Sequence, residues 1–189
     1  MLLKIKREVC LARYRNFPLC SYDPNSDEEV FYFPKVFKRG WYEIPSAPKR
    51  TFSKRLVTEL IKFITTCKFD RMIFLSDNVS PWVTKLSASR TDYPPLINAV
   101  AYFEKNKLGK KYNGGIEVPM IDLPEFFKHY FCITQCDASF HSGYFCDPAQ
   151  SFIGNIHYSG EVQICALTKK FDSIFTEVLP ETKFQRSDR

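Results

Sequence analysis

Glycine is scarce in this chain, with 7 residues among 189. Few positions are therefore available for a glycine-rich loop that would bind phosphate through its backbone amides. Long hydrophobic runs are also missing, because the longest mostly apolar stretch, residues 96–103, is far shorter than the roughly 20 residues that span a bilayer. Charged residues begin at Lys4, which leaves no room for a signal-peptide core at the N-terminus. We therefore expect a cytoplasmic protein without membrane segments.

Common catalytic motifs are absent from the sequence as well. It contains no G-x-S-x-G, H-E-x-x-H, G-x-x-x-x-G-K-S/T or G-x-G-x-x-G pattern. The 7 cysteines are odd in number and scattered, which is typical of reduced core thiols and not of a disulfide framework. Cys132 and Cys136 follow zinc-ligand spacing only loosely, because His141 and Cys146 do not form a second close pair.

These absences favour a binding protein, and we predict no catalytic residue, no metal and no cofactor. An enzyme that uses His141 or His157 with a neighbouring cysteine or carboxylate is kept as a third hypothesis, because the sequence does not show which side chains meet in space.

The composition is that of a folded globular domain, with 44% hydrophobic, 25% charged and 16% aromatic residues. Apolar residues recur with the helical period at 53–67 and 95–108, and a third helix is expected after Asp122. Short apolar or alternating segments elsewhere predict strands. We predict a single α+β domain over residues 1–182, with a mostly antiparallel sheet and about three helices, followed by a polar tail at 183–189.

Basic residues concentrate in the segment 35–55, which holds seven lysines and arginines and one acidic residue, with aromatic rings between them. This mixture is typical of single-stranded nucleic-acid surfaces, and it equally fits half-buried strands whose apolar face points inward. The two interpretations differ in the burial of Phe33, Phe37, Trp41 and Phe52, which we predict to lie mainly in the core. A nucleic-acid-binding module is therefore the alternative hypothesis, and its candidate residues are Lys38, Arg39, Trp41, Arg50, Lys54 and Arg55.

Acidic residues dominate the segment 112–165, which holds six of them against one basic residue. Such a segment is either a solvated face or a docking surface for a basic protein, because opposite charges accelerate encounter and set the register of binding. The candidate partner-binding residues are the acids of this segment with two neighbouring tyrosines, namely Asp137, Tyr144, Asp147, Tyr158 and Glu161.

Six short stretches carry a resemblance to a known family: FLSDN at 74–78, PW at 81–82, SRTDYPPL at 89–96, KYNGGI at 111–116, IGNI at 153–156 and YSG at 158–160. With them the chain resembles, over about half its length, small cytoplasmic immunity proteins of bacterial contact-dependent inhibition systems. The resemblance implies a non-catalytic protein that binds and neutralises one cognate toxin domain. The net charge of +6 departs from the acidic character of immunity proteins that block nucleases, so a nuclease partner would depend on docking through the acidic segment.

Overall fold

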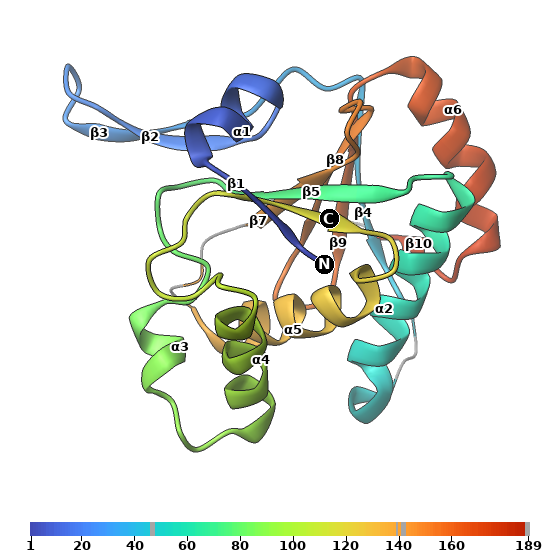
Figure 1. Ribbon diagram of the computed structural model, residues 1–189. Coiled ribbons are helices and arrows are strands. Elements are labelled where there is room, and N and C mark those ends of the chain that lie inside the picture. Colours follow the sequence, from blue (N-terminus) through green and yellow to red (C-terminus); the bar gives the residue numbers. More distant parts are fainter. Residues whose placement is uncertain (46–47, 139, 141–142, 188–189) are drawn as a thin grey trace.

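An eight-stranded antiparallel sheet forms the centre of the computed structural model, which describes residues 1–45, 48–138, 140 and 143–187 (Figure 1). Near both edges of the sheet, strands that are distant in the chain pair with each other, so the sheet joins the N-terminal and C-terminal parts of the protein. Across the sheet the strands are β1 Leu3–Ile5, β6 Gly115–Pro119, β5 Arg71–Ser76, β7 Gly143–Cys146, β8 Phe152–Ile156, β9 Val162–Ala166, β4 Lys38–Glu43 and β10 Gln185–Arg186.

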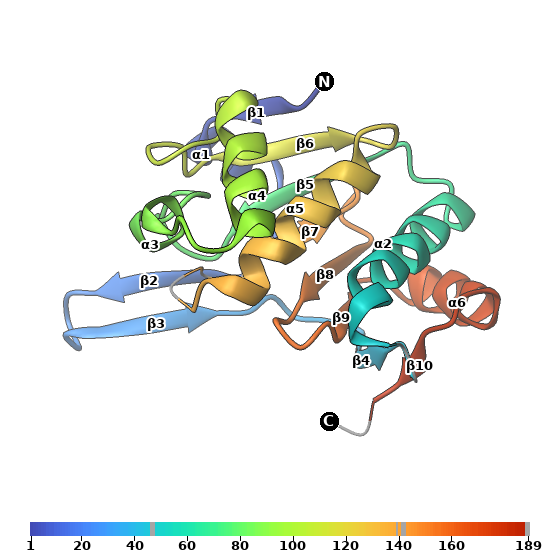
Figure 2. The ribbon, with the colours of Figure 1, turned by 90° about the horizontal axis from the view of Figure 1, so that it is seen from below.

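Helices lie on both faces of this sheet, with most of them on one face. In Figure 1, α2, α4 and α5 lie below the sheet and α1 lies above it, and Figure 2 shows α5 between α2 and α4. The helices are α1 Arg7–Arg13, α2 Lys49–Thr66, α3 Lys85–Ser89, α4 Pro94–Lys105, α5 Leu123–Cys136 and α6 Lys169–Val178, the last of which continues into a 3₁₀ turn at Leu179–Glu181.

Phenylalanine rings fill the main core between the sheet and the helices below it. The ring of Phe74 on β5 has its centroid 4.5 Å from that of Phe126, 5.4 Å from that of Phe127 and 5.5 Å from that of Phe145. All four side chains are fully buried. Such edge-on and tilted ring pairs add to the stabilisation from apolar burial, which explains how a chain with few glycines but many aromatics packs this layer.

A smaller cluster on the opposite face of the sheet lies beneath α1 and the segment that follows it. Cys10, Tyr14 and Phe17 pack there against Leu75 and Ile153 of the sheet. Helix α1 and the segment after it cover the middle strands on this second face of the sheet. No helix in the described ranges lies over the same face of β4. Side chains on that face of β4 therefore stay partly open to solvent.

A separate two-stranded ribbon, residues 19–32, projects from the body of the protein (Figures 1 and 2). It consists of β2 Leu19–Asp23 and β3 Glu28–Tyr32, which pair antiparallel with each other and with no other strand among the described residues. All five residues of β3 are exposed. A backbone hydrogen bond from Cys20 N to Asp77 O, 2.7 Å long, anchors the base of the ribbon to the loop after β5.

The predicted fold class is confirmed, because the structure is one compact α+β domain with a mostly antiparallel sheet. The three predicted helices correspond to α2, α4 and α5, but the number of helices was too low. Apolar residues alternate with polar ones at 3–11, which favours a single strand, but the strand ends at Ile5 and the chain continues as α1. Among the described residues, no helix has both the length and the apolar composition needed to cross a membrane.

The prediction of a polar tail at 183–189 was wrong for residues 184–187. Phe184 is 8% exposed, and β10 pairs with the edge of β4. Ser187 N also donates to Trp41 O over 2.9 Å. The exposed backbone groups of β4 supply these partners, so a polar sequence becomes an edge strand without needing its own apolar pattern.

Candidate functional site

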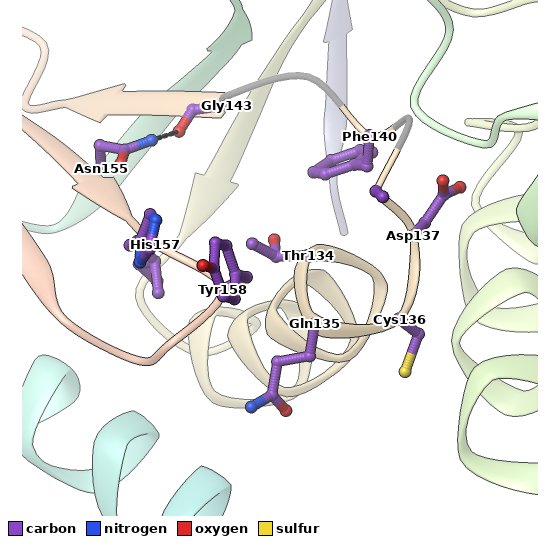
Figure 3. Close-up of a pocket in the computed structure, with 11 residues that line it drawn as sticks. Thr134, Gln135, Cys136, Asp137, Phe140, Gly143, Asn155, His157 and Tyr158 are labelled. Carbon is purple, nitrogen blue, oxygen red and sulfur yellow. Dashed lines mark hydrogen bonds between the residues drawn. The ribbon is translucent and has the colours of Figure 1, made fainter.

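A cavity of about 350 Å³ lies between the C-terminal end of α5 and the hairpin that joins β8 to β9. Figure 3 shows Thr134, His157 and Tyr158 around it, whereas Cys136 and Asp137 point away from the hairpin. The amide of Asn155 is held by its donation to Gly143 O over 2.9 Å. The cavity thus combines an apolar wall with a few polar groups, which is the general character of a small binding pocket.

A hydrogen-bond network orders the hairpin beside this cavity. Ser159 Oγ donates to Glu161 Oε2 over 3.0 Å and lies 2.7 Å from His157 Nδ1, while Ser187 Oγ donates to Glu161 Oε1 over 2.9 Å. In a Ser-His-acid triad the histidine stands between the other two groups and takes the serine proton. Here Ser159 lies between His157 and Glu161 and donates a hydrogen bond to the carboxylate, so the order of the three groups differs from that of a triad and their contacts hold the turn.

The candidate interface residue Asp137 lies inside the protein. It is 2% exposed, and its Oδ2 accepts hydrogen bonds from the hydroxyl groups of Thr84 and Ser87. These contacts join the end of α5 to the start of α3. Asp137 is therefore a buried acceptor in this fold, and its prediction as an exposed interface charge was wrong.

Asp147 is also buried, at 1% exposure, in the turn between β7 and β8. Its Oδ1 accepts from the backbone N–H of Ser151 at 2.6 Å and of Phe152 at 3.3 Å. Its Oδ2 accepts from Ala149 N at 3.1 Å and Ser151 Oγ at 2.8 Å. The carboxylate accepts from backbone N–H groups of the turn, as Asp side chains do in many turns. The prediction that Asp147 lies at an exposed interface was therefore also wrong.

The three remaining predicted interface residues have different environments. Tyr144 is 7% exposed and belongs to the cluster on the second face, where its ring centroid lies 6.2 Å from that of Phe33, so its assignment to the interface was wrong too. Glu161 is engaged in the hairpin network, with 15% of its side chain exposed. Tyr158, at 64% exposure, is the one member of the set that offers a large open surface.

The predicted nucleic-acid residues of β4 are divided between the two faces of the sheet. Lys38 lies 3.1 Å from Asp172 of α6, on the face covered by the helices. Arg39 and Trp41 lie on the opposite face, because residues 39 and 41 alternate with residue 38 along the strand. The Arg39 guanidinium stacks 4.1 Å from the centroid of the Phe33 ring. The other three candidates, on the solvent side of α2, are Arg50, Lys54 and Arg55.

The predicted core position was wrong for Phe37, whereas Phe33 and Phe52 pack against the two core clusters as partly buried residues. Phe37 is 53% exposed, and Phe33, Trp41 and Phe52 are partly buried. The Trp41 ring lies edge-on to the His157 ring, with their centroids 6.1 Å apart. The second face of β4 lacks a covering helix in the described ranges, and that local gap leaves Phe37 and Trp41 less buried than aromatic rings usually are.

The environments of His129, Cys10 and Cys165 are those of buried side chains that contribute to the packing of the fold. His129 stacks on Tyr102 with ring centroids 4.4 Å apart, and burial lowers its pKa against the opposing effect of the Glu125 carboxylate. Burial raises the pKa of Cys10 and of Cys165 to about 11, which suppresses their thiolate forms. Across the described ranges, no three His, Cys, Asp or Glu residues are grouped to hold a metal ion. His141, named in the third hypothesis, lies outside the described residues.

No known protein family, curated protein or solved structure matches this chain. Geometry, charge and exposure are therefore the observations that bear on its function.

One exposed feature that the sequence analysis did not assign to a site is the ribbon of residues 19–32. Its apolar side chains are open to solvent, with Tyr22 60% exposed, Tyr32 52% and Phe31 49%. The ribbon has four acidic residues and no basic one, although the whole chain carries a net charge of +6. The acids are Asp23, Asp27, Glu28 and Glu29. The run Val30-Phe31-Tyr32 directly after these acids was the signal that could have revealed it.

Proposed function

We propose that this protein is a non-catalytic immunity or antitoxin-type protein that binds and neutralises one cognate bacterial toxin domain. The exposed ribbon is the observation that carries the proposal. A two-stranded ribbon is marginally stable by itself, and strands with unpaired edges and open aromatic rings favour association with another chain. Rings of this kind are also enriched where proteins bind one another. The sequence resemblance over residues 74–167 points to the same class of function.

The charge of the ribbon specifies the chemistry of the partner. Glu28 and Glu29 are exposed near the turn, and the apolar rings of Phe31 and Tyr32 lie toward the base of the same ribbon. We expect the toxin domain to present a basic surface around an apolar groove, because this combination matches both features. The acids would then accelerate encounter, and the rings would carry most of the affinity.

Binding and protection test this function directly. The chain is co-expressed with the candidate toxin encoded beside its gene, and growth of the host and the dissociation constant of the purified pair are measured. The double variant Phe31→Ser with Tyr32→Ser is expected to weaken binding by at least 10-fold, since truncation of buried interface aromatics costs about 2 kcal/mol or more. Tyr93→Ser, at another exposed ring, is the control and should bind as the parent does.

Two results would contradict the proposal in different ways. If the parent chain neither binds nor neutralises any neighbouring toxin, the immunity function is wrong. If it binds but the Phe31 and Tyr32 variant binds equally well, the function stands and the ribbon is not the interface. Tyr158→Ser would then test the hairpin beside the cavity, which holds the one open residue of the predicted set.

The alternative, a nucleic-acid-binding module that uses residues 35–55, receives less support. Its cations lie on two faces of the sheet, and the Lys38 ammonium is paired with Asp172. Phe37 and Trp41 are nevertheless less buried than core residues, which keeps this segment available for a test. Loss of nucleic-acid binding in the triple variant Arg50→Gln, Lys54→Gln and Arg55→Gln would support it.

A further inference from the structure

A second group of lysines gathers where three distant segments of the chain meet. The loop after α4 lies beside β1, where Lys4 Nζ donates to Lys107 O over 3.5 Å, and Figure 2 shows the end of α4 next to β1. The same loop lies beside the segment after β5, because Trp82 N donates to Tyr112 O over 3.0 Å. The lysine patch formed there consists of Lys4, Lys85, Lys107, Lys110 and Lys111.

The lysine patch lines two adjoining hollows in the surface. One, of about 420 Å³, is lined by Lys4, Lys107, Lys110 and Lys111 together with the Tyr112 ring. The other, of about 540 Å³, shares Lys110 and Lys111 and adds Lys85 on its far side. Neither hollow has an acidic residue in its described lining. The two hollows share Lys110 and Lys111, and the charged residues in their described linings are all basic.

The lysines of the patch also lack ion-pair partners in the part of the chain that the structure describes. No carboxylate there lies within 4.0 Å of any of the five ammonium groups. Two other lysines are paired, Lys38 with Asp172 at 3.1 Å and Lys128 with Glu125 at 2.9 Å, and what distinguishes the patch is that five lysines without an ion-pair partner among the described residues gather in one place. Five uncompensated cations around a concave surface concentrate positive potential and attract a polyanion.

The helix dipole explains only part of this cluster. Lys107 follows the C-terminus of α4, where a cation is favourable in any helix. Lys4 and Lys85 come from other elements, and Lys110 and Lys111 lie beyond the helix end. A nucleic-acid strand carries phosphates at regular spacing, which matches lysines spread over two adjoining hollows.

We propose that the lysine patch binds the phosphate backbone of nucleic acid. The site is separate from the ribbon and from residues 35–55, so it adds a function to the one proposed above and does not depend on it. Each lysine that neutralises a phosphate releases condensed counterions, and the affinity then falls with salt in proportion to the number of contacts. Sequence preference is not expected, because contacts to phosphates carry no information on the bases.

Fluorescence anisotropy with labelled single-stranded RNA, single-stranded DNA and duplex DNA of about 20 nucleotides tests the patch between 50 and 200 mM salt. The patch variant combines Lys107→Gln, Lys110→Gln and Lys111→Gln. If each lysine contacts one phosphate, the slope of log affinity against log salt on single strands should become shallower by about 2. Affinity at 100 mM salt should fall by at least 10-fold, and the matching triple change to arginine should restore it.

The control variant removes the same charge elsewhere, through Lys169→Gln, Lys170→Gln and Lys183→Gln. These residues are exposed and lie on and after α6, at the other side of the molecule (Figure 1), so this variant should bind as the parent does. Equal losses in both triple variants would overturn the proposal, because the attraction would then come from net charge alone. Equal unfolding midpoints of all variants in urea show that the fold is intact.

Three other outcomes also overturn it. Failure of the parent chain to bind any of the three nucleic acids at 50 mM salt rules the site out. Binding only to vesicles that contain anionic lipid would assign the patch to a membrane surface. Self-association that the patch variant abolishes, without nucleic-acid binding, would assign it to the acidic ribbon of a second copy.

Discussion

Replacing Asp147 by alanine is expected to destabilise the protein without touching any binding surface. The carboxylate is buried and accepts four hydrogen bonds, three from backbone N–H groups of Ala149, Ser151 and Phe152 and one from a hydroxyl group. Alanine would leave these donors without their acceptor. The donor of Phe152 is the most costly one, because it is buried and water does not replace the carboxylate there.

The magnitude follows from the number of bonds and from their partial exposure. A hydrogen bond to a charged group contributes roughly 1.5–3 kcal/mol, but the donors of Ala149 and Ser151 are only partly buried and can reach water. We therefore expect a loss of about 3–4 kcal/mol in the free energy of unfolding, out of the roughly 5–15 kcal/mol of a typical domain. Asp147→Asn keeps one acceptor oxygen and should lose about half as much.

Urea unfolding, followed by circular dichroism, measures this loss as a lower midpoint with an unchanged slope. Glu28→Ala on the exposed ribbon is the matched control and should change stability by less than about 0.5 kcal/mol. If Asp147→Ala is as stable as the control, the four hydrogen bonds do not contribute as argued.

Three further predictions concern single residues. Gly160→Ala should lower the thermal midpoint, because Gly160 has φ +91° and an added Cβ would lie 2.1 Å from the Phe52 ring. Native Cys10 and Cys165 should resist iodoacetamide at pH 8 and react after unfolding, as mass spectrometry would show, because burial raises the pKa of both. Burial lowers the pKa of His129 in the folded state, so the stability that its neutral form contributes is lost as the pH falls below about 6.5. In His129→Phe the midpoint of urea unfolding should therefore depend less on pH between pH 7 and pH 5.

Local periodicity was enough to predict much of the fold. Apolar residues at helical spacing marked α2, α4 and α5, because each of these helices buries one stripe against a single sheet face. Continuous or alternating apolar runs marked β5, β8 and β9, which have covered faces. These elements carry the fold class, so α+β was predictable from one sequence.

Elements that depend on distant partners could not be predicted in this way. β10 is a strand because the edge of β4 offers it hydrogen bonds, and its own residues, Gln185 and Arg186, show no strand pattern. The ribbon gives little strand signal in the sequence, since β3 is exposed throughout and β2 is at most partly buried, so no fully covered face imposes an alternation.

Burial of apolar surface is encoded residue by residue, so the sequence predicts the helices and strands of this protein and the large apolar groups that fill its core. What its charged side chains do is visible only in the folded chain. Asp137 and Asp147 look identical in sequence to the exposed acids of the ribbon, yet they lie inside and accept hydrogen bonds from elements that folding brings to them. Lys4 and Lys111 are likewise distant in the chain and line one hollow. The role of a charged side chain depends on its neighbours in space, and the backbone path sets those neighbours.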